Sequence, residues 1–245
     1  MKKKIIISGN WKMNKTIQET ETFLEEIKTL NLNKNIEICL FIPYTNLATA
    51  IKYSNNMKIG AQNCHWEEFG TFTGEISVRM LDSLGIKNIL IGHSERRKYF
   101  KENCEIINKK IHIALKYDMN ITLCVGETLE ERNSKIERQA ILSQLKKSFY
   151  NVSKDFISNF IIAYEPVWAI GTGITAEPSQ AEEMCKFIKK SVYELYKKSI
   201  RVIYGGSVNS GNIENFLKQN NINGCLIGAS SLKVENFEKL INKCV

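Results

Sequence analysis

The sequence predicts a single (β/α)8 barrel, on the basis of two regularities and the chain length. Short apolar runs rich in β-branched residues alternate with longer runs in which apolar residues recur at three- and four-residue spacing. The short runs are continuously apolar, which is typical of strands buried on both faces of a parallel sheet. Eight strand–helix units in 245 residues give about 31 residues each, close to a (β/α)8 barrel of about 250 residues. A doubly wound open sheet is the alternative.

Each expected strand is a compact run of Ile, Leu, Val, Phe, Tyr, Cys or Ala that ends at a polar residue or a glycine. In chain order the strands are KIIISGN at 4–10, IEICLFI at 36–42, MKIGAQ at 57–62, NILIGH at 88–93, NITLCVG at 120–126, FIIAYE at 160–165, RVIYGG at 201–206 and GCLIGA at 224–229. Between them lie amphipathic helical patterns such as TIQETETFLEEIKTL at 16–30, ENCEIINKKIHIALKY at 102–117 and AEEMCKFIKKSVYELYKK at 181–198.

The composition predicts one globular domain over residues 1–245. The chain is 43% hydrophobic, contains three prolines, and has no linker, low-complexity segment or shift in composition that would divide it. The basic start followed by Ile5–Ile7 imitates a signal peptide, but its apolar run ends at Ser8. No segment approaches the roughly 18 apolar residues of a membrane helix. The seven cysteines are scattered without metal-ligand spacing, so we expect no metal and a reducing, cytoplasmic location.

The formal charge of +8 admits a nucleic acid, an acidic substrate or a lysine-rich solvated surface. The lysines are dispersed along helical segments rather than gathered into a basic stripe with interleaved aromatic residues. We therefore expect no nucleic-acid partner, although a phosphorylated metabolite would benefit from the positive field.

In such a barrel the catalytic groups follow the carboxyl ends of the strands. Polar or glycine-bearing segments stand at these positions: Asn10-Trp11-Lys12, Gln62-Asn63, His93-Ser94-Glu95, Cys124 to Glu127, Glu165, Gly205-Gly206-Ser207 and Gly228-Ala229-Ser230. The predicted rim thus carries a cation, an imidazole and a carboxylate.

Glu165 is the most informative residue, because a carboxylate at the end of a buried strand costs several kcal/mol unless it is compensated. The loop after it begins with Pro166 and places Trp168 and Ile170 between glycines. Such a loop is either a tight turn or a lid whose apolar underside closes over a catalytic base.

Lys12 and His93 each have an ordinary and a chemical interpretation. Lys12 alone would be a surface lysine, but at the rim it becomes a candidate anion clamp. His93 precedes an expected helix start, where the helix dipole disfavours the imidazolium. The other two histidines, His65 and His112, are expected to be structural or solvated.

The neighbours of these groups are expected to be structural. Glu95, Arg96 and Arg97 suit an ion-pair network that holds the turn, and Cys124 suits packing rather than nucleophilic catalysis. The glycine loops after the seventh and eighth strands are either ordinary turns or a phosphate cradle built from backbone N–H groups.

Six motifs together closely resemble triosephosphate isomerase, in order and over nearly the whole chain. They are GNWKMN, GAQNC with FTGEIS, IGHSERR, CVGE, YEPVWAIGTG and YGGSV. The resemblance implies the TIM-barrel fold and cofactor-independent interconversion of dihydroxyacetone phosphate and D-glyceraldehyde 3-phosphate, in glycolysis and gluconeogenesis. A glutamate base, a neutral histidine and a closing loop are the known roles in that family.

Site residues follow from the same resemblance. It implies that Glu165 is the base, His93 the neutral acid, and Lys12 and Asn10 the groups that stabilise developing charge. It further implies that backbone amides at Gly171, Ser207, Gly228 and Ala229 hold the phosphate. The chain departs from the family at Ile174 and at Ala229, where a second glycine is usual.

The resemblance also implies a homodimer, in which Thr73 of the FTGE loop meets the Asn10 region of the other subunit. Local packing of Phe72 would be the plain explanation of that loop. Two alternative functions remain open: Lys12 could form a Schiff base in an aldolase-like lyase, or the barrel could be an inactive binding module.

Overall fold

The computed structural model describes residues 4–29, 33, 35–54, 57–170 and 175–244, and it is a closed parallel barrel. The strands are β1 (Ile5–Asn10), β2 (Ile36–Ile42), β3 (Lys58–Ala61), β4 (Asn88–Ile91), β5 (Asn120–Val125), β6 (Phe160–Tyr164), β7 (Arg201–Tyr204) and β8 (Gly224–Ile227). They pair in sequence order, and β8 returns to β1. All eight lie within the predicted runs, so the barrel prediction is confirmed and an open sheet is excluded.

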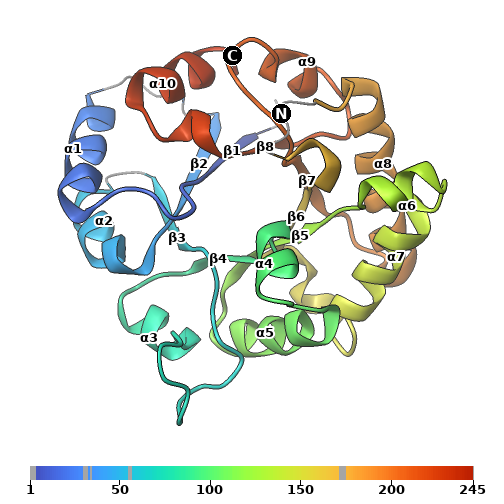
Figure 1. Cartoon of the computed structure of the whole chain (residues 1–245), viewed down its shortest axis with the longest axis horizontal. Coiled ribbons are helices and arrows are strands. Elements are labelled where there is room, and N and C mark those ends of the chain that lie inside the picture. Colours follow the sequence, from blue (N-terminus) through green and yellow to red (C-terminus); the bar gives the residue numbers. More distant parts are fainter. Residues whose placement is uncertain (1–3, 30–32, 34, 55–56, 171–174, 245) are drawn as a thin grey trace.

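Helices form an outer ring around the strands (Figure 1). They are α1 (Ile17–Lys28), α2 (Leu47–Tyr53), α3 (Val78–Ser83), α4 (Ser94–Tyr99), α5 (Cys104–Lys116), α6 (Leu129–Asn133), α7 (Glu137–Ser148), α8 (Pro178–Tyr196), α9 (Ile213–Leu217) and α10 (Val234–Asn242). Short 3-10 turns lie at Tyr44–Asn46, Lys154–Asn159, Val167–Ala169 and Ala229–Ser231. No helix among the described residues is long and apolar enough to cross a membrane.

Two layers of apolar side chains explain why the strands are continuously apolar. The inner layer fills the barrel with Ile6, Cys39, Phe41, Leu90, Cys124, Ala163, Ile203 and Leu226. The outer layer lies between strands and helices: Ile7 of β1, for example, belongs to the same buried cluster as Leu24 and Ile27 of α1. Because successive residues of a strand point to opposite faces, most strands contribute to both layers, and β3 contributes Ile59 and Ala61 to the outer one.

The barrel is paired unevenly around its circumference. Residues 5 to 10 of β1 are all in register with residues 36 to 41 of β2. Between β7 and β8 only Tyr204 and Cys225 are in register. Asn223 extends that junction, because its N–H donates to the Val202 carbonyl at 2.7 Å and its side-chain oxygen accepts from the Val202 N–H at 3.1 Å. The junction of β7 with β8 is therefore the least paired part of the ring.

Candidate active site

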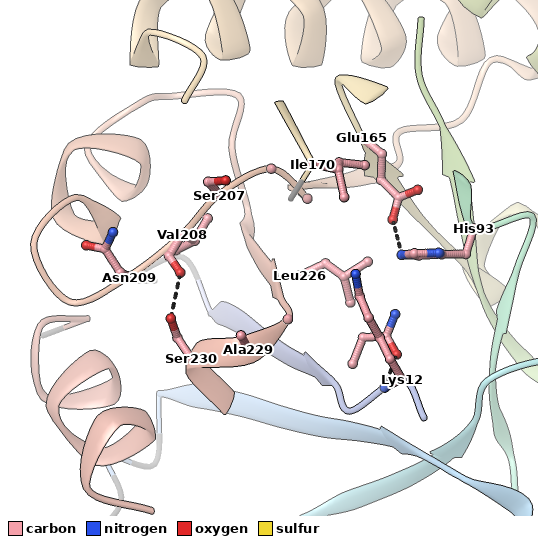
Figure 2. Close-up of a pocket in the computed structure, with 14 residues that line it drawn as sticks. Lys12, His93, Glu165, Ile170, Ser207, Val208, Asn209, Leu226, Ala229 and Ser230 are labelled. Carbon is pink, nitrogen blue, oxygen red and sulfur yellow. Dashed lines mark hydrogen bonds and ion pairs between the residues drawn. The ribbon is translucent and has the colours of Figure 1, made fainter. Parts of the chain in front are cut away.

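A cavity of about 280 Å³ opens at the carboxyl ends of the strands, where the sequence placed its candidate groups (Figure 2). Its lining residues come from the ends of β1, β4, β6, β7 and β8 and the segments that follow them. They are Asn10, Lys12, His93, Glu165, Ile170, Gly205, Gly206, Ser207, Val208, Asn209, Leu226, Gly228, Ala229 and Ser230. The four predicted catalytic residues and three of the four predicted phosphate-binding residues thus share one cavity. Gly171, the fourth, lies outside the described residues, as does Ile174.

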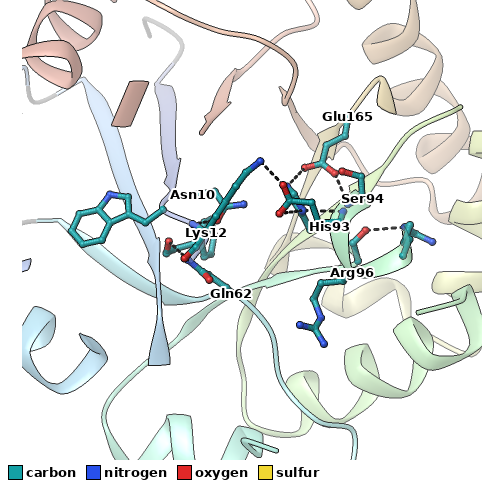
Figure 3. Close-up of polar contacts among 12 residues, drawn as sticks. Asn10, Lys12, Gln62, His93, Ser94, Arg96 and Glu165 are labelled. Atoms are coloured by element: carbon teal, nitrogen blue, oxygen red, sulfur yellow. Dashed lines mark hydrogen bonds and ion pairs between the residues drawn. The ribbon is translucent and has the colours of Figure 1, made fainter. Parts of the chain in front are cut away.

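Glu165 is buried but compensated. Its side chain is 2% exposed, and its Oε1 lies 3.2 Å from His93 Nε2. Its Oε2 accepts a hydrogen bond of 3.0 Å from the backbone N–H of Ser94 (Figure 3). The burial cost anticipated from the sequence is thus met by two donors at the start of α4.

The contacts of His93 define which ring nitrogen carries the proton. His93 is the residue that caps α4, and its Nδ1 accepts the N–H of Glu95 at 3.2 Å. A nitrogen that accepts a hydrogen bond has no proton, so the neutral ring carries its proton on Nε2, which points toward Glu165. In that neutral form the Nε2–H donates into the cavity.

Lys12 reaches the same cavity from the end of β1. Its Nζ lies 2.6 Å from Glu95 Oε1, and its N–H donates to the Asn10 side-chain oxygen at 3.0 Å. The Gln62 amide donates to the Lys12 carbonyl at 2.9 Å. These contacts hold Lys12 at a φ of 54°, a left-handed conformation that costs a non-glycine residue free energy. Lys12 thus reaches the cavity with its ammonium group from a strained backbone conformation.

Close backbone packing fixes the position of Glu165. Its N–H donates to the Val125 carbonyl at 2.8 Å. A Cβ on Gly126 would lie 1.6 Å from the Glu165 carbonyl oxygen, so only glycine fits there. Cys124 also lies against the site: burial, and then the charge of Glu165 and a hydrogen bond to it, raise the pKa of its thiol well above the usual value. This thiol therefore acts as a packing group rather than a nucleophile.

Arg96 and Arg97 hold the turn that carries His93. Arg96 Nε donates to Glu102 at 2.5 Å, and Arg97 donates to the carbonyls of Gly92 and Cys124 at 2.8 and 3.0 Å. Glu95 differs from the expectation, since it pairs with Lys12 across the cavity rather than with these arginines.

The stem of the predicted lid is tied to a residue that sequence reasoning gave no role. Glu127 is fully buried, and its Oε1 accepts from Tyr164 OH at 3.1 Å, Trp168 Nε1 at 2.8 Å and Arg132 at 3.0 Å. Its backbone carbonyl accepts the N–H of Val167 at 3.0 Å. Trp168 is thus anchored beside the strand ends, while Ile170 lines the cavity. A carboxylate after CVG was the only sequence signal for this anchor.

The segments after β7 and β8 form the opposite wall. The Ser207 hydroxyl donates to the Ala169 carbonyl at 3.0 Å. The Ser230 hydroxyl donates to the Val208 carbonyl at 3.1 Å (Figure 2). Ser231 fixes the turn at Gly228 by donating its N–H and hydroxyl to the Gly228 carbonyl at 2.9 and 2.7 Å. The sequence missed Val208, Asn209 and Leu226, whose side chains are not distinctive in isolation.

The other two histidines and Thr73 lie outside the lining of the cavity. His65 packs against Trp66 and Phe72 with ring centroids 4.1 and 4.4 Å away, and His112 contacts the Tyr150 carbonyl at 2.9 Å. Thr73 is exposed, in the segment between β3 and α3 that projects from the barrel in Figure 1. Within the described part of the chain no three metal-ligating side chains gather.

Comparison with known proteins agrees with this arrangement. The family model described as triosephosphate isomerase matches residues 5–244. The chain is 46% identical to the triosephosphate isomerase of Finegoldia magna over 247 residues, covering 98% of both chains. It is 43% identical to those of Acetivibrio thermocellus and Caldanaerobacter subterraneus subsp. tengcongensis, covering 98% and 97% of this chain and 98% of each relative. The chain therefore belongs to the triosephosphate isomerase family.

Proposed function

We propose that this chain interconverts dihydroxyacetone phosphate and D-glyceraldehyde 3-phosphate with Glu165, His93, Lys12 and Asn10 as its catalytic residues. The observation that carries the proposal is the convergence of a buried carboxylate, an imidazole with its proton on Nε2 and an ammonium group on one cavity. Proton transfer next to a carbonyl needs these three functions: a base, a hydrogen-bond donor to the oxygen and a positive charge.

The first step breaks a C–H bond of dihydroxyacetone phosphate. Glu165 takes the proton from C1, the electron pair forms a double bond between C1 and C2, and negative charge passes to the C2 oxygen. His93 Nε2–H and the Lys12 ammonium stabilise that charge. His93 then relays a proton from the C1 oxygen to the C2 oxygen, and Glu165 returns its proton to C2. Because Glu165 contacts His93 Nε2 in the structure, its carboxylate has to turn toward the substrate carbon.

The phosphate is assigned to the wall formed by Ser207, Gly228 and Ala229, with Gly171 completing the set from outside the described residues. Backbone N–H groups suit an anion because they donate hydrogen bonds to it and, unlike a titratable side chain, do not gain or lose a proton. The position of Ile170 on the cavity lining and the anchoring of Trp168 support a role for this segment as a lid over the intermediate. Exclusion of water and fixed geometry there favour reprotonation over loss of the phosphate group.

The direct test is a coupled assay of purified protein with glyceraldehyde 3-phosphate in the presence of a chelator, which should show isomerase turnover. A Schiff-base lyase would instead trap a covalent adduct on Lys12 when borohydride is added with dihydroxyacetone phosphate. An inactive binding module would bind the ligand without turnover, and either result would overturn the proposal.

The neutral ring of His93 is expected to carry its proton on Nε2 and none on Nδ1. The reason is the Glu95 N–H, which is directed at Nδ1 and needs an acceptor there. Nitrogen-15 NMR of the ring should show a protonated Nε2 and a bare Nδ1 in the neutral form. His112, whose ring lies at an exposed contact, serves as the comparison within the same spectrum. A neutral ring with its proton on Nδ1 would contradict the assigned role.

Replacing Ala229 by glycine is expected to tighten binding of a phosphate-bearing substrate analogue about fivefold, which is roughly 1 kcal/mol. Ala229 begins a 3-10 turn on the cavity wall, and we expect its methyl group to compete for space with an anion held by backbone N–H groups. Both the inhibition constant of the analogue and KM should fall. If neither constant falls, the turn has accommodated the methyl group.

The projecting segment before α3 leads us to propose a homodimer that buries Thr73. Phe69 and Met13 are 74% and 97% exposed in the single chain, so a second copy that covers these segments would bury apolar surface. Thr73→Arg should convert the protein to monomers in sedimentation velocity, whereas arginine at the exposed Thr22 of α1 should leave the dimer intact. A parent protein that sediments as a monomer would refute the dimer.

The cellular location, the domain extent and the metabolic role belong to the same proposal. We place the protein in the cytoplasm as a single domain over residues 1–245 that acts in glycolysis and gluconeogenesis. All seven cysteines are free in the described structure, and most of them are buried. The substrates carry phosphate, so the positive formal charge favours their approach.

A further inference from the structure

A second cavity, of about 730 Å³, opens at the opposite end of the barrel from Glu165. Phe160 and Arg201, which line it, are the first residues of β6 and β7. Glu165 and Ser207 lie beyond the last residues of the same strands. Since the strands are parallel, the two cavities lie at opposite ends of the barrel and do not share a wall.

The residues that line this cavity include four cations and, among those the structure describes, no carboxylate. They are Ile157, Ser158, Phe160, Lys186, Lys189, Lys190, Tyr193, Ser199, Ile200, Arg201, Asn221 and Asn223. The three lysines and Tyr193 recur at spacings of three and four, so they share one face of α8. Lysines that looked dispersed in the sequence are thus gathered by the helix, and Arg201 adds a fourth charge across the cavity.

Two carboxylates of α8 lie near these lysines but outside the lining of the cavity. Glu182 keeps its negative charge and accepts hydrogen bonds from the N–H and side-chain amide of Asn221 at 2.9 and 2.6 Å. Glu194 lies 3.7 Å from Lys190, but both side chains are more than 60% exposed, where an ion pair contributes little.

Arg201 is only loosely paired. Glu37 lies 3.4 Å from it and is shared with Lys58, which is closer at 2.7 Å. The cavity therefore keeps a positive excess that an anionic ligand can use.

We propose that this cavity binds a short phosphate chain, as found in inorganic triphosphate or a nucleoside triphosphate. Lys186 and Lys190 stand one helical turn apart, about 6 Å along the axis, so they can contact successive phosphate groups of one ligand. The volume lies in the range of small-molecule sites. Tyr193, at 55% exposed, offers an aromatic face beside the lysines.

The test is titration of isotope-labelled protein with inorganic triphosphate at low salt, followed by NMR of the backbone amides. Saturable shifts are expected at Tyr193 and Ser199, with one site per chain. Lys186→Gln/Lys190→Gln should weaken binding about tenfold and leave isomerase turnover unchanged. Lys239→Gln/Lys243→Gln, on α10 and at its C-cap, is the matched control, because it removes two exposed lysines at the same spacing and should change the affinity less than twofold.

Three results would overturn the proposal. They are an absence of saturable binding at millimolar triphosphate, shifts confined to Ser207 and Gly228, and equal weakening in both double variants. A parallel titration with ATP tests whether the recognised ligand is an inorganic phosphate chain or a nucleotide. Equal affinities identify the phosphates alone as the recognised group, whereas tighter ATP binding that Tyr193→Ala abolishes identifies a nucleotide. Because the readout is binding, it is independent of whether the active site works as proposed.

Discussion

Glu165→Gln is expected to lower kcat by about 10⁴-fold, the upper end of what a positioned acid or base contributes. The amide is nearly isosteric, and its one oxygen can keep the hydrogen bond from the Ser94 N–H, whereas its NH2 group cannot accept from His93 Nε2–H. It cannot take a proton from carbon. Substrate affinity, measured as KM, should change little because the phosphate contacts lie on the opposite wall.

Glu165→Asp separates the presence of a carboxylate from its position. Shortening the side chain retracts the base by about 1 Å and should cost on the order of 100-fold in kcat. Glu25→Gln, at an exposed position on α1, is the control for a general loss of charge and should have no effect. Near-normal turnover in either Glu165 variant would exclude this residue as the base.

Lys12→Met is expected to lower kcat/KM by about 10³-fold, because the ammonium is the only lysine charge on the described lining of the cavity. Methionine keeps the length and apolar stem of the side chain and removes the charge. Lys12→Arg should recover part of the loss, since it restores the cation with a different shape.

The loss from Lys12→Met should appear in both kinetic constants, because a cation near both the phosphate and the developing oxyanion stabilises substrate and transition state. Lys146→Met on α7, an exposed position, should leave both constants unchanged. A loss smaller than tenfold in Lys12→Met would show that Lys12 serves mainly to hold Glu95.

Local patterns were sufficient to predict the fold. The expected run at 36–42 coincides with β2, and the pattern at 102–117 contains α5 with one or two residues to spare at each end. These elements follow from side-chain periodicity, which is a property of neighbouring residues. Their closure into a barrel followed from the number of units and their length rather than from any single segment.

Contacts between distant residues could not be predicted in the same way. The sequence identified Glu165 because its environment was locally improbable, but Glu127 received no role although three donors converge on it. One of those donors, Trp168, is 41 positions away, and Glu95 meets Lys12 across 83 positions. Side-chain partners at such separations depend on the closed barrel and not on spacing along the chain.

The sparse pairing between β7 and β8 gives the proposed substrate a part in maintaining the fold. The segments that leave these two strands carry Ser207 and Gly228, so a phosphate bound by both would bridge the least paired junction of the ring. A ligand that binds the folded protein and not the unfolded chain raises the free energy of unfolding by mass action. The metabolite pool that this enzyme interconverts would then also set its resistance to heat and proteolysis, and depletion of that pool would shorten the lifetime of the protein itself.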